Sequence, residues 1–267
     1  MQTTVGNAWE IPPTSPRRAA EVATAELDAE LVLLGTLDEQ DWRRPTDCVG
    51  WDVHDLTAHL VGEYEEITRP WVLLRRLRKG HRRYPHLSRL DAHNQQQLDE
   101  LGDQSGEELT TALARLAPEA IRARRRLPGP LRRLPVAKLF PEEARRMPDA
   151  GLGYLLDVIM VRDVWMHRVD LARATGRPLA LGEHDREVVA QVVRDVGRCW
   201  NGPSVLLELG GPAGRRWRLG KDVPAATVRT DAVGYLRAVS GRDDHPALEV
   251  DGDPAAAAAA AAAGVVF

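Results

Sequence analysis

An aspartate and a histidine have the residue types and spacing of part of a metal site, and a second histidine lies in another predicted helix. His59 lies in an apolar, helix-forming stretch, and Asp163 precedes His167 by four residues in another. Residues four apart on a helix share one face, with Cβ atoms about 5–6 Å apart. Three protein ligands plus an open position make a catalytic zinc site, and the cores of helix bundles often hold such sites. Asp163, His167 and a third ligand from a facing helix would therefore suit a divalent metal.

The same residues also allow a purely structural interpretation. A carboxylate and a histidine at this spacing are often a simple ion pair on a helix surface. His59, taken alone, is equally typical of a hydrogen-bonded histidine on an inner helix face. Residue spacing leaves both interpretations open.

The elements that would position these residues are mostly helices. Asp52 and Asp55 form an N-cap and a first-turn acid at the start of the His59 helix, and Ser105 with Glu108 forms a capping box. Five prolines between residues 128 and 148 predict an extended connection or lid. Apolar residues at helical spacing predict helices over residues 16–37, 53–68, 88–101, 105–127, 152–175 and 183–200.

The pattern changes after residue 180. Short β-like runs separated by turn residues occupy residues 204–209, 216–219, 226–229 and 247–250. A helix follows Thr230 or Asp231, and Asp253-Pro254 begins a final alanine-rich helix that Gly264 ends. We therefore predict an α-helical N-terminal domain over residues 1–180 and a small α+β C-terminal domain over residues 181–267.

Composition and charge exclude several classes of protein. The chain has 267 residues, of which 43% are hydrophobic and 28% charged, and its net charge is −3. Its two cysteines, Cys48 and Cys199, suit a reducing compartment, and residues 1–18 lack the apolar core of a signal peptide. The apolar run 255–267 is too short to span a bilayer. Arginine-rich residues 122–126 have no interleaved aromatic residues to stack bases. We expect a cytoplasmic protein that binds neither nucleic acid nor membrane.

Two helical motifs and a C-terminal segment resemble one known family. The motifs are Asp41-Trp42, Pro45-Thr46, Cys48, Gly50-Trp51 with Asp55-Leu56-Thr57-Ala58-His59-Leu60, and then residues 163–176; the C-terminal segment comprises residues 228–242 and 248–253. Together they resemble the DinB-like, mycothiol-dependent maleylpyruvate isomerase family. The resemblance implies a four-helix-bundle (DinB-like) domain followed by a small sterol-carrier-like domain.

The resemblance also implies a ligand set. His59, Asp163 and His167 would bind Zn²⁺ or another divalent metal. The family has a glutamate where this chain has Asp163, whose side chain is one methylene shorter, so Glu63 is a substitute ligand. Asp170 either orients an imidazole N–H or forms a salt bridge with Arg173 or Arg168.

The expected chemistry is that of a metal-bound thiolate. A small thiol such as mycothiol would add to an electrophilic small-molecule substrate, giving either S-transfer or cis–trans isomerisation. Arg242 either pairs with a carboxylate of the substrate or thiol as a catalytic residue, or complements a helix dipole. Cys48 is expected to be a packed residue and not the nucleophile. The alternatives are a non-catalytic small-molecule-binding protein and a metal-dependent hydrolase. Trp51, Trp165 and Tyr64 are either pocket walls or core residues.

Overall fold

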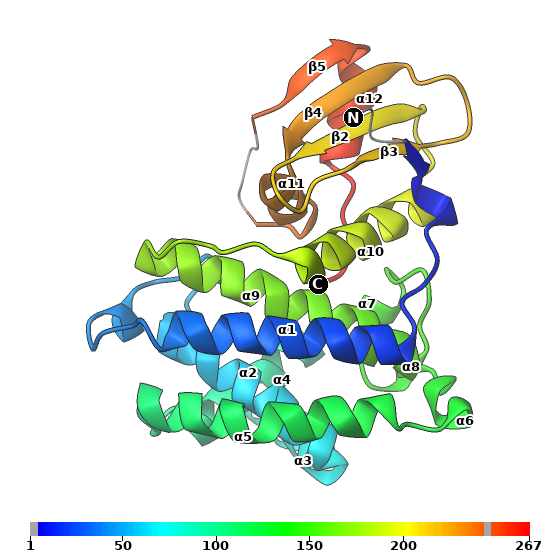
Figure 1. The fold of residues 1–267 in the computed structure, drawn as a ribbon. Coiled ribbons are helices and arrows are strands. Elements are labelled where there is room, and N and C mark those ends of the chain that lie inside the picture. The colour runs from blue at the N-terminus through cyan, green and yellow to red at the C-terminus, as the bar shows by residue number, and fades with distance from the viewer. Residues whose placement is uncertain (1–4, 243–246) are drawn as a thin grey trace.

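The computed structural model describes residues 5–242 and 247–267, and this part of the chain is mostly helical with one five-stranded sheet. The predicted combination of a helical part and a small sheet is therefore confirmed in outline. In Figure 1 the sheet stands above the helices, and α10 (Glu183–Cys199) lies between them. Helix α10 contacts α1, α9, β3 and α11, so it belongs to the packing of both parts.

Four long helices form the centre of the helical part. They pack against one another as neighbours: α1 (Pro16–Leu34), α2 (Val53–Thr68), α5 (Gly106–Arg125) and α9 (Met160–Thr175). The predicted capping box of Ser105 and Glu108 is present, and the predicted N-cap Asp52 and first-turn acid Asp55 form a second one. Because apolar residues recur on the inner faces of these helices, one continuous core joins them.

Helices α3 (Pro70–Arg83) and α4 (Arg89–Leu101) form a hairpin beside α2. We did not predict α3, because Pro70 suggested only the end of the preceding helix. A proline is also well suited to the first turn of a helix, and α3 begins there. Gly80 allows the close approach of the hairpin, since a Cβ at this position would lie 2.2 Å from the carbonyl oxygen of Ala92.

The sequence predicts an extended connection or lid over residues 128–148, and the extended conformation is wrong. The segment folds into short turns instead: α6 (Gly129–Arg132), η3 (Val136–Lys138) and α7 (Pro141–Ala144). Two of its prolines stand in the first turns of α6 and α7, where the missing N–H has no helical partner to lose.

The predicted helix over residues 152–175 is interrupted. It starts as α8 (Leu152–Tyr154), widens into the π-helical turn η4 (Leu155–Ile159) and continues as α9. Gly176 ends α9 in the left-handed conformation, with a φ of 66°. A π turn leaves some carbonyl groups without the usual helical donor, and such turns are frequent at functional sites.

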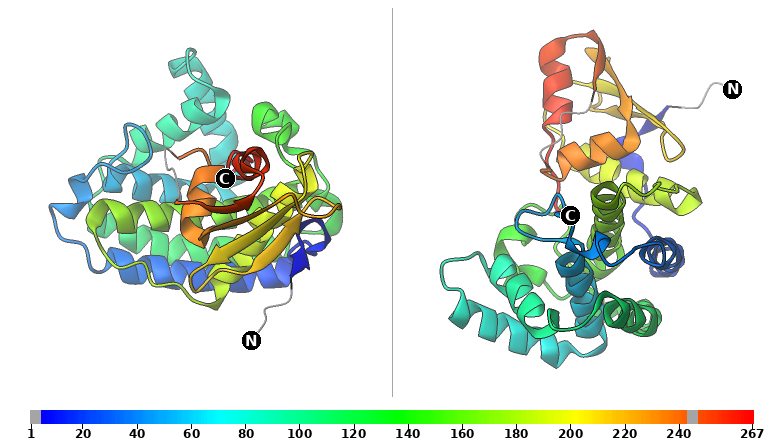
Figure 2. Two further views of the ribbon diagram at one scale, coloured as in Figure 1. Left: turned by 90° about the horizontal axis from the view of Figure 1, so that it is seen from above. Right: turned by 90° about the vertical axis from the view of Figure 1, so that its left-hand side faces the viewer.

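The sheet has the strand order β1-β3-β2-β4-β5. Its strands are β1 (Gly6–Asn7), β2 (Val205–Gly210), β3 (Arg216–Leu219), β4 (Ala226–Asp231) and β5 (Glu249–Gly252). Neighbours are parallel at β1–β3 and β2–β4 and antiparallel at β2–β3 and β4–β5. Helices α11 (Ala232–Val239) and α12 (Pro254–Ala261) pack on the sheet, as the right-hand view of Figure 2 shows.

The first strand comes from the opposite end of the chain. Strand β1 and the turn η1 (Ala8–Glu10) lie against β3 and α10, although they precede the long helices in sequence. The division at residue 180 remains a prediction, and the structure adds that residues 6–10 pack with the sheet side. No helix of the described residues is long and apolar enough to cross a membrane.

Candidate metal centre

The three residues singled out by their spacing lie together. His59 comes from α2, and Asp163 and His167 come from successive turns of α9. Asp163 Oδ2 lies 3.8 Å from His59 Nε2 and 3.4 Å from His167 Nε2. One ligand atom from each of the three residues lies within 4.8 Å of the other two. The packing of α2 on α9 thus brings together residues that are more than 100 positions apart in the sequence.

A hydrogen bond from α4 orients His59. His59 Nδ1 lies 2.8 Å from Gln97 Oε1, and Gln97 Nε2 donates to Glu66 Oε1 at 3.0 Å. Since the second bond makes Oε1 of Gln97 the acceptor, Nδ1 of His59 must carry the proton. In the neutral imidazole of His59, Nε2 is then the nitrogen with a free lone pair, and it faces Asp163, as metal ligation requires.

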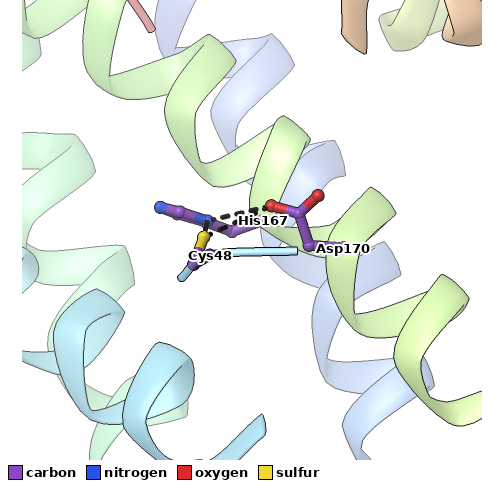
Figure 3. A group of neighbouring side chains, drawn as sticks. All are labelled: Cys48, His167 and Asp170. Carbon is purple, nitrogen blue, oxygen red and sulfur yellow. Dashed lines mark hydrogen bonds and ion pairs between the residues drawn. The ribbon is translucent and has the colours of Figure 1, made fainter. Parts of the chain in front are cut away.

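His167 is oriented from its other side by Asp170. His167 Nδ1 lies 3.5 Å from Asp170 Oδ2 and 3.8 Å from Cys48 Sγ, a group that Figure 3 shows. Asp170 itself accepts hydrogen bonds from Arg237 and Arg242. Burial alone would raise the pKa of Asp170, but hydrogen bonds from His167 and Arg242 outweigh burial and lower this pKa to about 2. Asp170 is therefore an ionised acceptor for the imidazole.

The predicted alternative for Asp170 assigned the wrong arginines. Arg168 forms ion pairs with Glu26 and Asp185, and Arg173 forms one with Asp47. The side chain of Arg168 turns toward α1 and α10 because it is buried there between two carboxylates.

Cys48, His167 and Asp170 also form a cluster whose ligand atoms lie close together. Arg242 Nη2 lies 2.5 Å from Asp170 Oδ2 and 4.0 Å from Cys48 Sγ. A cation placed among these atoms would be repelled by the positive charge of this guanidinium. The cluster of Cys48, His167 and Asp170 therefore suits a metal less well than the cluster of His59, Asp163 and His167. Cys48 is half-buried in the loop before α2. Its position in the sequence did not indicate that it lies close to the candidate ligand His167.

Glu63 adds a second carboxylate to the centre. Its Oε1 lies 3.8 Å from His59 Nε2, one turn along α2. Within the described residues, Glu63 Oε2 and Asp163 Oδ2 are buried and have no hydrogen-bond partner. Buried oxygens without partners are costly, and a cation would satisfy both.

The ionisable groups of the centre lie close together and are buried, and both conditions shift their pKa values. Burial and the neighbouring Asp163 charge raise the pKa of Glu63 to about 8. Burial also opposes ionisation of Asp163, but the neighbouring charge of His167 outweighs burial and lowers the pKa of Asp163. Burial alone would lower the pKa of His167, but the charge of Asp163 outweighs this effect and raises the pKa well above 6.5.

These donors fit a divalent metal such as Zn²⁺. Imidazole nitrogens and carboxylate oxygens are its usual ligands, and tetrahedral bonds of about 2.0–2.1 Å place ligand atoms about 3.3 Å apart. The separations of 3.4 and 3.8 Å between Asp163 and the two histidines are close to that value. The shorter aspartate side chain therefore reaches both imidazoles, and Glu63 lies within reach as an additional ligand.

A cavity of about 430 Å³ opens beside the candidate ligands. His59, Glu63 and Asp163 line one part of it, and most of the other lining residues are apolar. These apolar residues come from α3, η4, the segment around α7 and the C-terminal residues, none of which the sequence analysis connected with the site.

The three aromatic residues considered as pocket walls are not among the described residues that line this cavity. Trp165 and Tyr64 are core residues, and the indole of Trp165 donates to Asp185. The Trp51 ring packs 5.1 Å from the His59 ring, measured between centroids. Arg242 is also absent from that lining; its guanidinium contacts Asp170 instead.

Comparisons with known proteins agree with the motifs. The family model described as the mycothiol maleylpyruvate isomerase N-terminal domain matches residues 20–172, more than half of the chain. A crystal structure of the mycothiol-dependent maleylpyruvate isomerase aligns with a TM-score of 0.58 and 16% sequence identity, covering 94% of this chain and 99% of the other. A mutant of that isomerase aligns with a TM-score of 0.56, the same identity and the same coverage. At this identity the two structures bear on the fold alone. No curated protein sequence matches the chain.

Proposed function

The chain belongs to the mycothiol maleylpyruvate isomerase N-terminal domain family, and from this premise we propose that it is an enzyme that uses a divalent metal to activate a small thiol. The thiol is mycothiol or a close analogue, and the metal is Zn²⁺ or a similar ion. The reaction is S-transfer to a small electrophilic substrate or its cis–trans isomerisation. The family membership supports thiol chemistry, and the donor atoms of the candidate centre support the metal.

One observation carries the proposal. Two imidazole nitrogens face Asp163 Oδ2, and this oxygen and Glu63 Oε2 are buried without a hydrogen-bond partner in the described part of the chain. The alternative of a simple ion pair does not account for this arrangement, because an ion pair alone would leave the Glu63 oxygen unsatisfied. The cavity gives a small molecule access to the same atoms.

The residues have separate roles in this proposal. His59, His167 and Asp163 hold the metal with Glu63 beside them, while Gln97 and Asp170 keep the two imidazoles in orientation. When bound, the metal supplies Lewis acidity that lowers the pKa of a coordinated thiol, so that the nucleophilic thiolate is available at neutral pH. The apolar wall of the cavity excludes water from the reacting groups.

Arg242 acts in this proposal as a positioning residue. It holds Asp170, which in turn faces His167, and so it reaches the candidate ligand through another side chain. This role replaces direct pairing with a substrate carboxylate, for which the guanidinium would first have to leave Asp170.

The test is metal content and thiol-dependent turnover of the full chain. We expect about one metal per chain, measured by mass spectrometry after dialysis, and loss of both metal and activity in His59→Ala and His167→Ala with unchanged helix content. His81→Ala, on the exposed face of α3, is the matched control and should keep the metal. Turnover is followed with mycothiol and two substrates, monochlorobimane for S-transfer and maleylpyruvate for isomerisation.

The thiol must come from solution and not from the chain. We therefore expect Cys48→Ser to keep activity near that of the wild type, and its complete inactivation would overturn this part of the proposal. Metal-dependent ester hydrolysis without added thiol would instead establish a hydrolase, and binding of thiol without turnover would establish a non-catalytic binding protein.

A further inference from the structure

Arg124 is a buried arginine without an ionic partner among the residues that the structure describes, and it lines the cavity beside the candidate metal centre. It lies near the end of α5 with 2% of its surface exposed. Its Nη1 donates to the carbonyl oxygen of Leu156 at 3.1 Å, whereas Nε and Nη2 are buried and have no partner in the described residues. Two N–H groups of this guanidinium are therefore unused, in a side chain that lines the cavity.

The nearby carboxylates are already engaged. Asp157 forms an ion pair with Arg132, and within residues 5–242 and 247–267 no carboxylate lies within salt-bridge distance of Arg124. Glu63 also lines the cavity, but its ion-pair contact in the described residues is with His59 and not with Arg124. Taking an unpaired guanidinium out of water is costly, so the molecule has a charge that an anion from outside would complement.

The π turn η4 keeps Arg124 in place. The carbonyl of Leu156, which accepts from Arg124, lies within η4, and three η4 residues (Leu155, Leu156 and Ile159) line the cavity. One turn later the same chain segment carries Asp163. The guanidinium and the candidate metal ligands therefore share one cavity wall.

We propose that this cavity binds a substrate with a carboxylate on an apolar body, and that Arg124 is the residue that binds the carboxylate. The apolar body would contact side chains such as Leu74, Leu139, Phe140, Met147 and Phe267, which line the cavity. Arg124 presents its unpartnered N–H groups to the carboxylate, as paired guanidinium and carboxylate groups do elsewhere. This inference adds a substrate class to the proposed function, whose metal and thiol it takes as given.

The test compares a carboxylate with its neutral analogue. Isothermal titration calorimetry with 4-phenylbutyrate and 4-phenylbutyramide on the metal-free full chain measures binding without a metal that could itself hold the carboxylate. We expect the carboxylate to bind about tenfold or more tightly than the amide, and Arg124→Met to abolish this preference while amide binding persists. Arg122→Met, an exposed arginine on the same helix, is the matched control and should behave as the wild type.

A second variant separates charge from geometry. Arg124→Lys keeps the charge but loses the planar fork, so we expect an intermediate preference, and it remains informative if the methionine variant does not fold. Equal binding of acid and amide by the wild type, or an undiminished preference in Arg124→Met or Arg124→Lys, would overturn the proposal.

The outcome is independent of turnover. A preference that depends on Arg124, together with no metal and no thiol chemistry, would refute the proposed function alone. Metal-dependent thiol chemistry without any carboxylate preference would refute the present inference alone.

Discussion

Among single residues, Glu63 and His167 determine how protons compete with a metal at the candidate centre. Both lie against Asp163, and their pKa values differ from the usual ones for that reason. The pKa of Glu63 is raised to about 8 by burial and by the Asp163 charge. The pKa of His167 is raised well above 6.5 by the same charge, against the effect of burial. At neutral pH each therefore holds a proton that a metal must displace.

Zinc affinity should accordingly increase with pH. Because Glu63 and His167 each lose a proton as the metal binds, we expect the release of about two protons per zinc near pH 7. For the same reason the zinc affinity should decrease steadily as pH falls below about 8. Calorimetry in buffers with different ionisation enthalpies measures the released protons. Glu63→Gln should reduce the release by about one, and an unchanged proton count in this variant would show that Glu63 does not titrate with the metal.

At the scale of elements, Gln97 of α4 orients the candidate metal ligand His59 on α2. Gln97 connects His59 to Glu66, and Glu66 is held in turn by Arg76 of α3 and His93 of α4. Gly62 makes room for this connection, since a Cβ there would lie 3.0 Å from the side chain of Gln97. The α3–α4 hairpin thus acts as a support for the metal-facing side of α2.

Removing that support should weaken metal binding without removing a ligand. Gln97→Leu frees His59 to change tautomer and rotate, and we expect zinc affinity to fall about 10–100-fold. Competition with a chromophoric chelator measures the change. Gln95→Leu on the same helix, whose amide contacts Asp99, is the control. Equal affinities for the two variants would mean that Gln97 has no orienting role.

At the scale of the whole molecule, Asp170 joins the helical part to the sheet side. Arg237, at the end of α11, and Arg242, just after it, both donate to this fully buried carboxylate on α9. The same carboxylate faces His167, so the contact between the two parts also reaches the candidate centre. The ion pairs of Arg237 and Arg242 with α9 and the orientation of His167 therefore share one side chain.

Asp170→Asn should consequently lower the free energy of unfolding by about 3–5 kcal/mol, because the half-buried Arg242 loses its carboxylate partner and the buried Arg237 loses it too, although its ion pair with Asp47 remains. Urea denaturation of the full chain measures this loss, and Glu21→Gln, which removes an exposed ion pair, should leave the free energy of unfolding close to that of the wild type. Since the pKa of Asp170 is lowered to about 2 from 3.8, its stabilisation is complete above pH 4 and is lost as pH falls toward 2. A deficit that persists undiminished at pH 2 would contradict this origin.

Much of the local structure was determined by the sequence alone. The helix around His59 has the predicted bounds and the predicted N-cap Asp52, and strand β3 matches its predicted residues. The spacing of Asp163 and His167 placed them on one face of a helix. These features depend on hydrogen bonds and side-chain periodicity within a few residues, and neighbouring sequence therefore contains the information.

Only the tertiary structure decided what surrounds those residues. Several contacts join segments that are far apart in the chain: Gln97 with His59, Arg242 with Asp170, Cys48 with His167, and Arg124 with the rest of the cavity lining. Their formation depends on how whole helices pack, which the composition and spacing of any one segment do not specify. The π turn η4 belongs to the same class, because its sequence is that of an ordinary helix and only the packing around it shows the widened turn. Local periodicity selected the candidate ligands, whereas packing determined their orientation, their charge and the cavity that they share.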